Sequence, residues 1–489
     1  MTKILIGIHG VLWGAPALVL ILGVGLYLSI RTGFAQLTLF PRALRTFCAM
    51  FLGRKNPDGV SPFRALCTAL AATVGTGNLV GVAGAICLGG PGAVFWMWLC
   101  AVLGMMTKFA EVTLAVRYRS REKGEPVGGP MYMILGGMGE RWRFLAGCYC
   151  FFGVVAAFGV GNATQINAVL SGIHAVLQPM GIVADRRTDL AIGLILAVLV
   201  GAMLLGGAKR IGATAEMLVP FASAAYIVLC AAVLILRADL LPGAFQDILR
   251  GAFSPRAVTG GVIGSGFQAL RTGCSRGVFT NEAGMGTASI AHASANVDHP
   301  VQQGLMGIME VFLDTVVICT MTALVILTSG VSIPYGQDAG GTLTAQAFSR
   351  VCGGGVNAFL AGALCCFAFA TVLGWGLYGA RCAEFLFGSR AWGFFALLQT
   401  VMVVLGAVLN TQTVWLLAET VNGLMAIPNL IALAYLSPEL VRLTVEYKEK
   451  SGGTAASGGN HADFHQRKPL RALSHAEIPP LCREGGERG

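Results

Sequence analysis

Residues 71–81 read Ala-Ala-Thr-Val-Gly-Thr-Gly-Asn-Leu-Val-Gly, a polar and glycine-rich stretch inside a longer apolar run. Gly75 and Gly77 lower helix propensity, and the hydroxyl and amide side chains of the stretch compete for backbone hydrogen-bond partners. Apolar sequence nevertheless continues on both sides, over residues 66–70 and 79–88. Opened backbone at membrane depth is tolerated only where protein or a water-filled cavity covers it. The stretch therefore predicts an interrupted membrane helix that forms a binding site.

The composition is typical of a polytopic membrane protein. Of the 489 residues, 55% are hydrophobic and 12% are charged, and the mean hydropathy is +0.70. An average soluble domain has about twice that share of charged residues. The 67 glycines suit close helix packing in lipid, and no separate soluble domain is visible.

The net charge of +10 raises the question of a nucleic-acid partner. The basic residues, however, lie mainly in short segments between apolar runs, which is the pattern of a cytoplasmic membrane face. The fourteen cysteines lie mostly inside apolar runs and show no repeated metal-ligand spacing. We therefore expect a lipid bilayer around the chain, no nucleic-acid partner and no organic cofactor.

A helix that crosses the hydrocarbon core needs about twenty apolar residues, and this rule gives eleven candidate spans. The chain is thus predicted to be an all-α integral membrane protein. The spans cover residues 11–30, 64–88, 93–116, 145–177, 189–205, 213–236, a weak seventh that starts near 257, 301–327, 357–387, 391–409 and 414–436. Residues 31–55 mix arginines with apolar side chains and are expected to lie on the membrane surface.

The basic residues also predict the orientation of the spans. With an odd number of spans and the N-terminus outside, the basic connectors after spans one, three and five share one side with the C-terminal tail. The positive-inside rule then makes that side cytoplasmic. We expect a cell-membrane protein with its N-terminus outside and its C-terminus in the cytoplasm.

A second interruption is predicted in span seven, where glycines crowd residues 260–266. The polar stretch 275–286 follows and must face protein or water. If span one is accessory, each interrupted helix opens a group of five, which is the pattern of an inverted-repeat transporter. The predicted units are residues 1–63 with the accessory helix and connector, 64–256 and 257–437 as two five-helix repeats, and 438–489 as a disordered tail.

Ordered motifs along the membrane region carry a family resemblance. They are Ala-Thr-Val-Gly-Thr-Gly-Asn at 72–78, Gly-Gly-Pro-Gly-Ala-Val-Phe-Trp-Met-Trp at 89–98, Gly-Gly-Pro-Met-Tyr at 128–132, Asn-Glu-Ala-Gly-Met-Gly at 281–286, Thr-Val-Leu-Gly-Trp at 371–375 and Asn-Gly-Leu-Met-Ala-Ile-Pro-Asn-Leu at 422–430. Together they resemble the alanine or glycine:cation symporter family of the amino acid–polyamine–organocation superfamily. The resemblance implies a LeuT-like fold with a five-plus-five inverted repeat, and uptake of alanine or glycine coupled to sodium.

An amino acid in its zwitterionic form needs donors at its carboxylate and acceptors at its ammonium group. We expect the amides near Thr76 and Gly77 to face the carboxylate, because the following half-helix directs its positive end there. The carbonyls of the same opened stretch would face the ammonium group or a cation. The resemblance adds further substrate contacts, namely Asn78, Gln165, Gly264, Gly266, Trp375 and Met425.

The resemblance also implies a sodium site, formed by the carbonyls of Ala71 and Val74 with the hydroxyl of Thr371. Thr73 and Asn78 are candidates for a second ion. The family usually has two hydroxyl residues before Val-Leu-Gly-Trp, whereas this chain has Ala370 and then Thr371. One hydroxyl ligand is therefore missing, and a carbonyl, a water molecule or coupling to protons is the alternative.

Ionisable residues inside membrane spans are costly and mark function or a charge pair. Asp314 and Glu310 lie one turn apart in span eight, whereas Arg271 lies just before the polar stretch 275–286 and Glu282 lies within it. We interpret these four as gating or scaffold residues. Three functions stay open at this stage: the sodium-coupled symporter of alanine or glycine, the same fold with another small neutral amino acid such as glutamine or with proton coupling, and a membrane enzyme or sensor. No Ser/His/Asp set, HExxH or CxxC pattern favours an enzyme.

Overall fold

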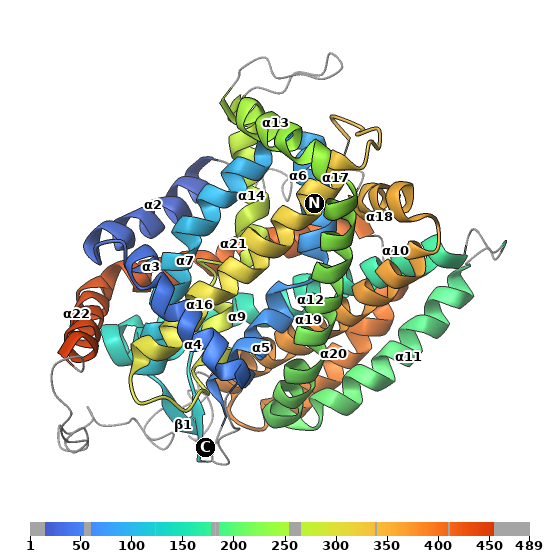
Figure 1. Cartoon of the computed structure of the whole chain (residues 1–489). Helices are drawn as coiled ribbons and strands as arrows, with labels where there is room; N and C mark the ends of the chain where they lie inside the picture. Colours follow the sequence, from blue (N-terminus) through green and yellow to red (C-terminus); the bar gives the residue numbers. More distant parts are fainter. Residues whose placement is uncertain are drawn as a thin grey trace.

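The structure describes residues 15–52, 60–122, 124–177, 181, 185–253, 266–337, 340–408 and 411–453. In this computed structural model the described residues form helices and one short hairpin (Figure 1). The hairpin pairs β1 (Ser120–Glu122) with β2 (Glu125–Val127) in antiparallel register.

The helices up to residue 253 include three short π-helical segments and two 3-10 turns. They are α2 (Ala15–Arg31), α3 (Ala35–Thr38), α4 (Phe40–Leu52), α5 (Pro62–Thr73), η1 (Gly77–Gly81), α6 (Val82–Gly89), α7 (Ala93–Arg117), α8 (Pro130–Met133), η2 (Ile134–Met138), η3 (Glu140–Trp142), α9 (Arg143–Phe158), η4 (Gly159–Ala163), α10 (Thr164–Leu177), α11 (Arg186–Leu204), α12 (Gly207–Leu236), η6 (Ala238–Leu240) and α13 (Leu241–Phe253).

The helices after residue 265 begin with a short interrupted pair. They are α14 (Gly266–Asn281), α15 (Thr287–His292), α16 (Pro300–Val311), η7 (Phe312–Cys319), α17 (Thr320–Thr328), α18 (Gly340–Cys352), α19 (Val356–Phe387), α20 (Ala391–Val408), α21 (Thr411–Tyr435) and α22 (Ser437–Gly453).

Apolar length in the described residues identifies seven helices that could cross a membrane, or up to nine if each of two bent pairs is one span. The seven correspond to predicted spans three to six and eight to ten. One bent pair, residues 62–73 with 77–89, bends by 51° and corresponds to the second predicted span. The predicted interruption at 71–81 is therefore confirmed.

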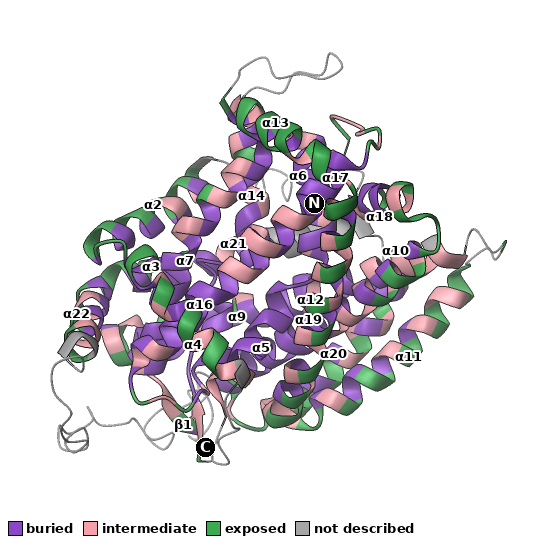
Figure 2. Ribbon diagram, in the orientation of Figure 1, coloured by how far each residue is buried: buried purple, intermediate pink, exposed green. Residues whose placement is uncertain are grey.

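The outer helices expose large apolar side chains. Val198 on α11, Phe221 on α12 and Phe394 on α20 have exposed fractions of 71%, 73% and 67%. Figure 2 shows exposed residues along α2 and α11 and mostly buried residues on α5. Such a surface suits a hydrocarbon environment and would be unfavourable in water.

Helix packing relates the two predicted halves of the chain. α7 packs against α16, α9 and α10 pack against α19, and α11 packs against α20. α14 and α15 contact α6 and α5 in the same way. Each pair joins helices of the same rank in the predicted repeats 64–256 and 257–437, whose boundaries stay a prediction.

The predicted connector and the start of the predicted tail both form helices in the structure. The connector forms the amphipathic helix α4, whose Phe40 ring packs edge-to-face on Phe312 with centroids 4.9 Å apart. The disordered tail predicted from residue 438 was placed too early, because α22 continues to Gly453. Leu440 and Leu443 of α22 are buried, so apolar packing stabilises a helix there despite the charged sequence.

Candidate functional site

The first helix break has a defined local structure. α5 ends at Thr73, and Val74 adopts an extended conformation with φ −76° and ψ 104° before the chain becomes helical again as η1. The Gly75 amide donates to Asn78 Oδ1 at 2.8 Å. The Asn78 side chain thus replaces a backbone acceptor that the break removes.

The second described break lies at residues 282–286, between α14 and α15. Glu282, Gly284 and Gly286 have positive φ angles of 53°, 97° and 76°. The predicted interruption at 260–266 falls mainly outside the described residues, which begin again at Gly266, and Gly264 lies outside them as well. The polar motif 281–286 therefore contains a break that the sequence analysis treated only as a polar flank.

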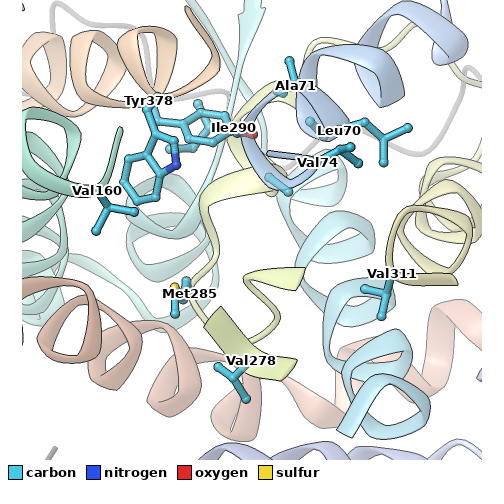
Figure 3. Packing of buried hydrophobic residues seen from close by; sticks show 14 of the residues in the cluster. Leu70, Ala71, Val74, Val160, Val278, Met285, Ile290, Val311 and Tyr378 are labelled. Atoms are coloured by element: carbon cyan, nitrogen blue, oxygen red, sulfur yellow. The ribbon is translucent and has the colours of Figure 1, made fainter. Parts of the chain in front are cut away.

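The two breaks share one small cavity. It is lined by Ala72, Thr73, Gly75, Thr76, Gly77, Val160, Gln165, Phe279, Thr280, Glu282, Thr371 and Trp375. These residues come from α5 and η1, from η4 and α10, from α14 and the turn after it, and from α19. Figure 3 shows the apolar surroundings, with Val74, Val160 and Tyr378 projecting from different segments of the chain.

The cavity brings together four of the predicted substrate contacts: Thr76, Gly77, Gln165 and Trp375. Met425 is buried but does not line the cavity, and its Sδ would be 3.7 Å from a Cβ added at Gly153 of α9. Asn78 caps the first break, and Gly266 is half-buried at the start of α14. Neither of these two lines the cavity.

Outside the opening stretch 71–81, three lining residues were not among the predicted site residues: Val160, Phe279 and Thr280. Thr280 lies close to the first break, because a Cβ added at Gly77 would be 3.3 Å from Thr280 Oγ1. The hydroxyl one residue before the Asn-Glu-Ala-Gly motif was the available sequence signal for this contact.

Gln165 has a fixed orientation at the cavity wall. Its Nε2 donates to the Val160 carbonyl at 3.1 Å, and the same carbonyl accepts from Thr164 Oγ1 at 2.8 Å. Gln165 Oε1 is buried and has no hydrogen-bond partner among the described residues. The amide therefore presents an acceptor without a partner, and the π-helical turn η4 is what makes Val160 available to two side chains.

The predicted cation ligands lie at the end of α5 and on α19, which touch. Ala71, Val74 and Thr371 are all buried, and Thr371 Oγ1 donates to the Phe367 carbonyl at 3.0 Å. Donation uses the hydroxyl hydrogen and leaves the oxygen lone pairs available to a cation. Gly374 packs on Ala72, whose Cβ would be 2.9 Å from an added Cβ, so α19 follows α5 closely. Thr73 Oγ1 is directed to the Ala69 carbonyl at 3.4 Å.

Glu282 links the second break to the cavity wall. Its Oε1 accepts from Trp375 Nε1 at 3.0 Å and its Oε2 accepts from Thr287 Oγ1 at 2.7 Å. Trp375 is fully buried and leaves room for no side chain at Gly161, since an added Cβ would overlap its own Cβ. Glu282 thus fixes the indole that closes one side of the cavity.

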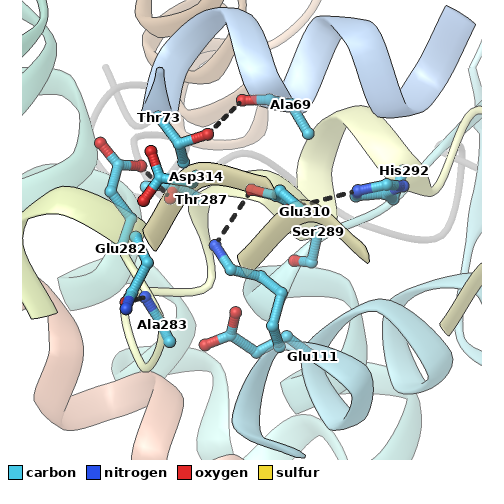
Figure 4. A network of polar contacts seen from close by, with 12 residues as sticks. Ala69, Thr73, Glu111, Glu282, Ala283, Thr287, Ser289, His292, Glu310 and Asp314 are labelled. Carbon is cyan, nitrogen blue, oxygen red and sulfur yellow. Dashed lines mark hydrogen bonds and ion pairs between the residues drawn. The ribbon is translucent and has the colours of Figure 1, made fainter. Parts of the chain in front are cut away.

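Buried charges surround this region (Figure 4). Asp314 accepts from Asn78 Nδ2 at 2.7 Å and from Thr315 Oγ1 at 2.8 Å. Glu310 pairs with Lys108 at 3.3 Å and bonds His292 at 3.0 Å. Arg271 is exposed on α14, in contrast to the buried carboxylates, and its gating role stays a prediction.

The sequence analysis missed Lys108 and Glu111, which lie within α7 and are fully buried. Their signal was present, because two ionisable residues near the middle of an apolar span indicate a charge pair or a functional role.

The family model described as the sodium:alanine symporter family matches residues 1–458. The chain belongs to this family. An uncharacterized transporter of Haemophilus influenzae is 44% identical over 455 residues, which cover 92% of this chain and 96% of that protein. The sodium/alanine symporter AgcS of Methanococcus maripaludis is 40% identical over 447 residues, which cover 90% of this chain and 96% of AgcS.

The fold of this family member also resembles a solved structure. The crystal structure of MhsT in complex with L-phenylalanine aligns with a TM-score of 0.55 at 16% identity, covering 81% of this chain and 99% of that chain. The predicted LeuT-like architecture is therefore confirmed. The protein is a multi-pass membrane transporter and not an enzyme.

Proposed function

We propose that this family member couples inward sodium flow to uptake of alanine or glycine by alternating access. The observation that carries the proposal is the cavity between the two helix breaks, because breaks in corresponding helices mark the substrate site of inverted-repeat transporters. The family and its similarity to AgcS support the sodium ion and the small amino acid.

The cavity chemistry suits a zwitterion. We assign the substrate carboxylate to the amides of Thr76 and Gly77, at the start of η1 and α6, where the helix dipole favours negative charge. The ammonium group is assigned to Gln165 Oε1, which is an acceptor without a partner in the described structure. Satisfying this buried oxygen would favour a substrate that carries an N–H donor.

The size of the substrate side chain is limited by the apolar residues of the cavity wall. Trp375, Phe279 and Val160 leave little space around the two breaks, which favours alanine and glycine over larger side chains. A single methylene is worth only about 1–3 kcal/mol in such a pocket, so the rigidity of Trp375 decides how well larger substrates are rejected. Its bond to Glu282 supplies that rigidity.

For sodium we propose the carbonyls of Ala71 and Val74 and the hydroxyl of Thr371. Sodium prefers oxygen ligands, and these residues lie where α19 meets the first break. The absence of a hydroxyl at Ala370 leaves one ligand to a carbonyl or to water. We also propose the outside N-terminus, the cytoplasmic C-terminus and the repeat boundaries 64–256 and 257–437.

The test is uptake of labelled alanine into proteoliposomes that contain the purified full chain. We expect uptake with an inward sodium gradient and much less with an imposed pH gradient alone, with glycine as the strongest competitor and leucine as a weak one. Uptake that does not depend on sodium would contradict the coupling. Failure to take up any small neutral amino acid, with the protein folded and inserted, would contradict the transport proposal.

A further inference from the structure

Contacts at both ends of the short helix α15 lead to two charged residues of α7. Lys108 and Glu111 lie three positions apart, so they share one face of α7, and both are fully buried. Glu111 contacts the turn before α15, and Lys108 reaches the end of α15 through Glu310.

Glu111 holds the turn that begins the second break. Its Oε1 accepts from the amides of Gly284 at 2.8 Å and Gly286 at 3.1 Å, and from Asn429 Nδ2 at 2.8 Å. Asn429 Nδ2 also donates to the Gly284 carbonyl at 2.8 Å. A buried carboxylate that accepts several N–H groups forms bonds about twice as strong as neutral ones. The turn is thus fixed between α7 and α21.

The far end of α15 is held by a second chain of contacts. His292 Nε2 lies 3.0 Å from Glu310 Oε2, and Glu310 Oε1 lies 3.3 Å from Lys108 Nζ. The His292 ring is held on its other side by Gln303 at 2.7 Å. Since Glu310 belongs to α16, the helices α7 and α16 hold the whole of α15 as one unit.

The turn also determines where Glu282 lies. Glu282 is two residues before Gly284, has a left-handed φ angle and bonds the cavity tryptophan Trp375. Left-handed backbone at a residue other than glycine persists only where its surroundings fix it. Releasing Gly284 and Gly286 would therefore release Glu282 and, through it, Trp375.

We infer that Glu111 is a positioning residue for transport: by accepting the Gly284 and Gly286 amides, it keeps the second break in the shape that places Glu282 and Trp375 at the cavity. The inference rests on the proposed function only for its uptake measurement. It adds a residue on α7 that lies outside the cavity and acts through the turn.

The test compares three variants of the full-length protein. Glu111→Gln keeps an acceptor oxygen, whereas Glu111→Leu removes it at similar volume. Thr113→Val is the matched control, because Thr113 is buried on the same helix and its hydroxyl has no partner in the described structure. Two measurements are made: hydrogen–deuterium exchange of the peptide that contains residues 282–286, and the KM for alanine uptake.

We expect Glu111→Leu to increase the exchange rate of this peptide about tenfold and to raise the KM for alanine about tenfold. Changes of this size are expected when a hydrogen bond to a charged group is lost. Glu111→Gln and Thr113→Val should stay within about threefold of the unmodified protein. A merely structural role would lower the amount of folded protein and leave the KM unchanged. If Glu111→Leu yields no folded protein, Asn429→Ala is tested instead. It removes the α21 amide that donates to Glu111, and it should increase the exchange rate and the KM by smaller factors.

Unchanged exchange and unchanged KM in Glu111→Leu would overturn the inference, as would equal losses in the Gln and Leu variants. The exchange measurement needs no transport. If the unmodified protein takes up no amino acid, the proposed function fails while the hydrogen bonds of Glu111 are still tested.

Discussion

Gly75 of the first break lies directly against Thr371 of α19, because a Cβ added at Gly75 would come within 2.8 Å of Thr371 Oγ1. The same added atom would be 3.8 Å from Gln165 Oε1. The backbone of the break, a hydroxyl of α19 and an acceptor of α10 therefore meet at one point. Only a residue without a side chain allows this approach.

Replacing Gly75 by alanine should therefore impair transport. The methyl group must displace the Thr371 hydroxyl, and alanine also favours a continuous helix over the break. We expect the initial rate of sodium-driven alanine uptake to fall by at least about tenfold, which corresponds to roughly 1.4 kcal/mol. Gly362→Ala on α19 is the control, since an added Cβ there has no atom within 4 Å. Normal uptake by Gly75→Ala would show that the close contact is not needed.

A leucine at Gly77 tests the cavity itself. The added Cβ would lie 3.3–3.4 Å from the atoms of Thr280, and the rest of the side chain would extend into space that the substrate needs. We expect Gly77→Leu to insert into the membrane and to lose alanine binding, measured by thermal stabilisation of the purified protein. Gly362→Leu should bind normally. Normal binding by Gly77→Leu would place the site elsewhere.

The first break was predictable because its cause is local. Two glycines and three polar side chains within six residues interrupt an otherwise apolar run, so helix propensity and membrane depth conflict at that position. The family motifs then indicated Gln165 and Trp375, which the structure brings to the same cavity.

The second break was less predictable because its cause is not local. Glycine density predicted a break at 260–266, which lies mainly outside the described residues, whereas the described turn at 282–286 is held by Glu111 of α7 and Asn429 of α21, which are far away in sequence. Helix periodicity carries no information about such a pairing. The wall residues Val160 and Phe279 are ordinary apolar residues, so only packing reveals them.

Ala370 offers a direct test of the sodium ligands. Serine at this position restores the hydroxyl that the family pattern has, whereas Thr371→Val removes the one that is present. We expect Ala370→Ser to lower the sodium concentration for half-maximal uptake, and Thr371→Val to raise it by about tenfold. Thr400→Val on α20 is the control, because Thr400 also donates to a carbonyl four residues earlier. If neither change at 370 or 371 alters the sodium dependence, α19 contributes no ligand.

Trp375 should control substrate size through its bond to Glu282. Trp375→Phe removes the indole N–H that donates to Glu282 Oε1 and places a smaller ring at the cavity wall. A buried carboxylate that loses a donor is destabilised by about 1–3 kcal/mol. We expect a higher KM for alanine and a gain in competition by larger neutral amino acids, both measured in the same uptake assay. A variant with reduced uptake but unchanged size preference would show that Trp375 does not set the pocket volume.

The docking of α22 should depend on pH through Glu439. Its carboxylate accepts from Arg442 at 2.6 Å and from Arg117, at the end of α7, at 3.0 Å. The hydrogen bond from Arg442 contributes most and the bond from Arg117 adds to it, so the pKa of Glu439 lies below its ordinary value. A carboxyl group whose pKa is lowered by folding stabilises the folded state above its unfolded pKa, and this contribution is lost as the pH falls through the folded pKa.

Glu439→Gln should therefore lower the free energy of unfolding at pH 7, and this loss should shrink as the pH falls through the lowered folded-state pKa of Glu439. The pairs are partly exposed, so the loss at neutral pH should be no more than about 1 kcal/mol. Thermal unfolding of the purified protein, followed from pH 7 to acidic pH, measures this change in stability. Glu449→Gln, an exposed change on the same helix, serves as the control and should show neither effect. A loss of stability for Glu439→Gln that stays the same as the pH is lowered would mean that packing of the side chain, and not its charge, anchors α22 to α7.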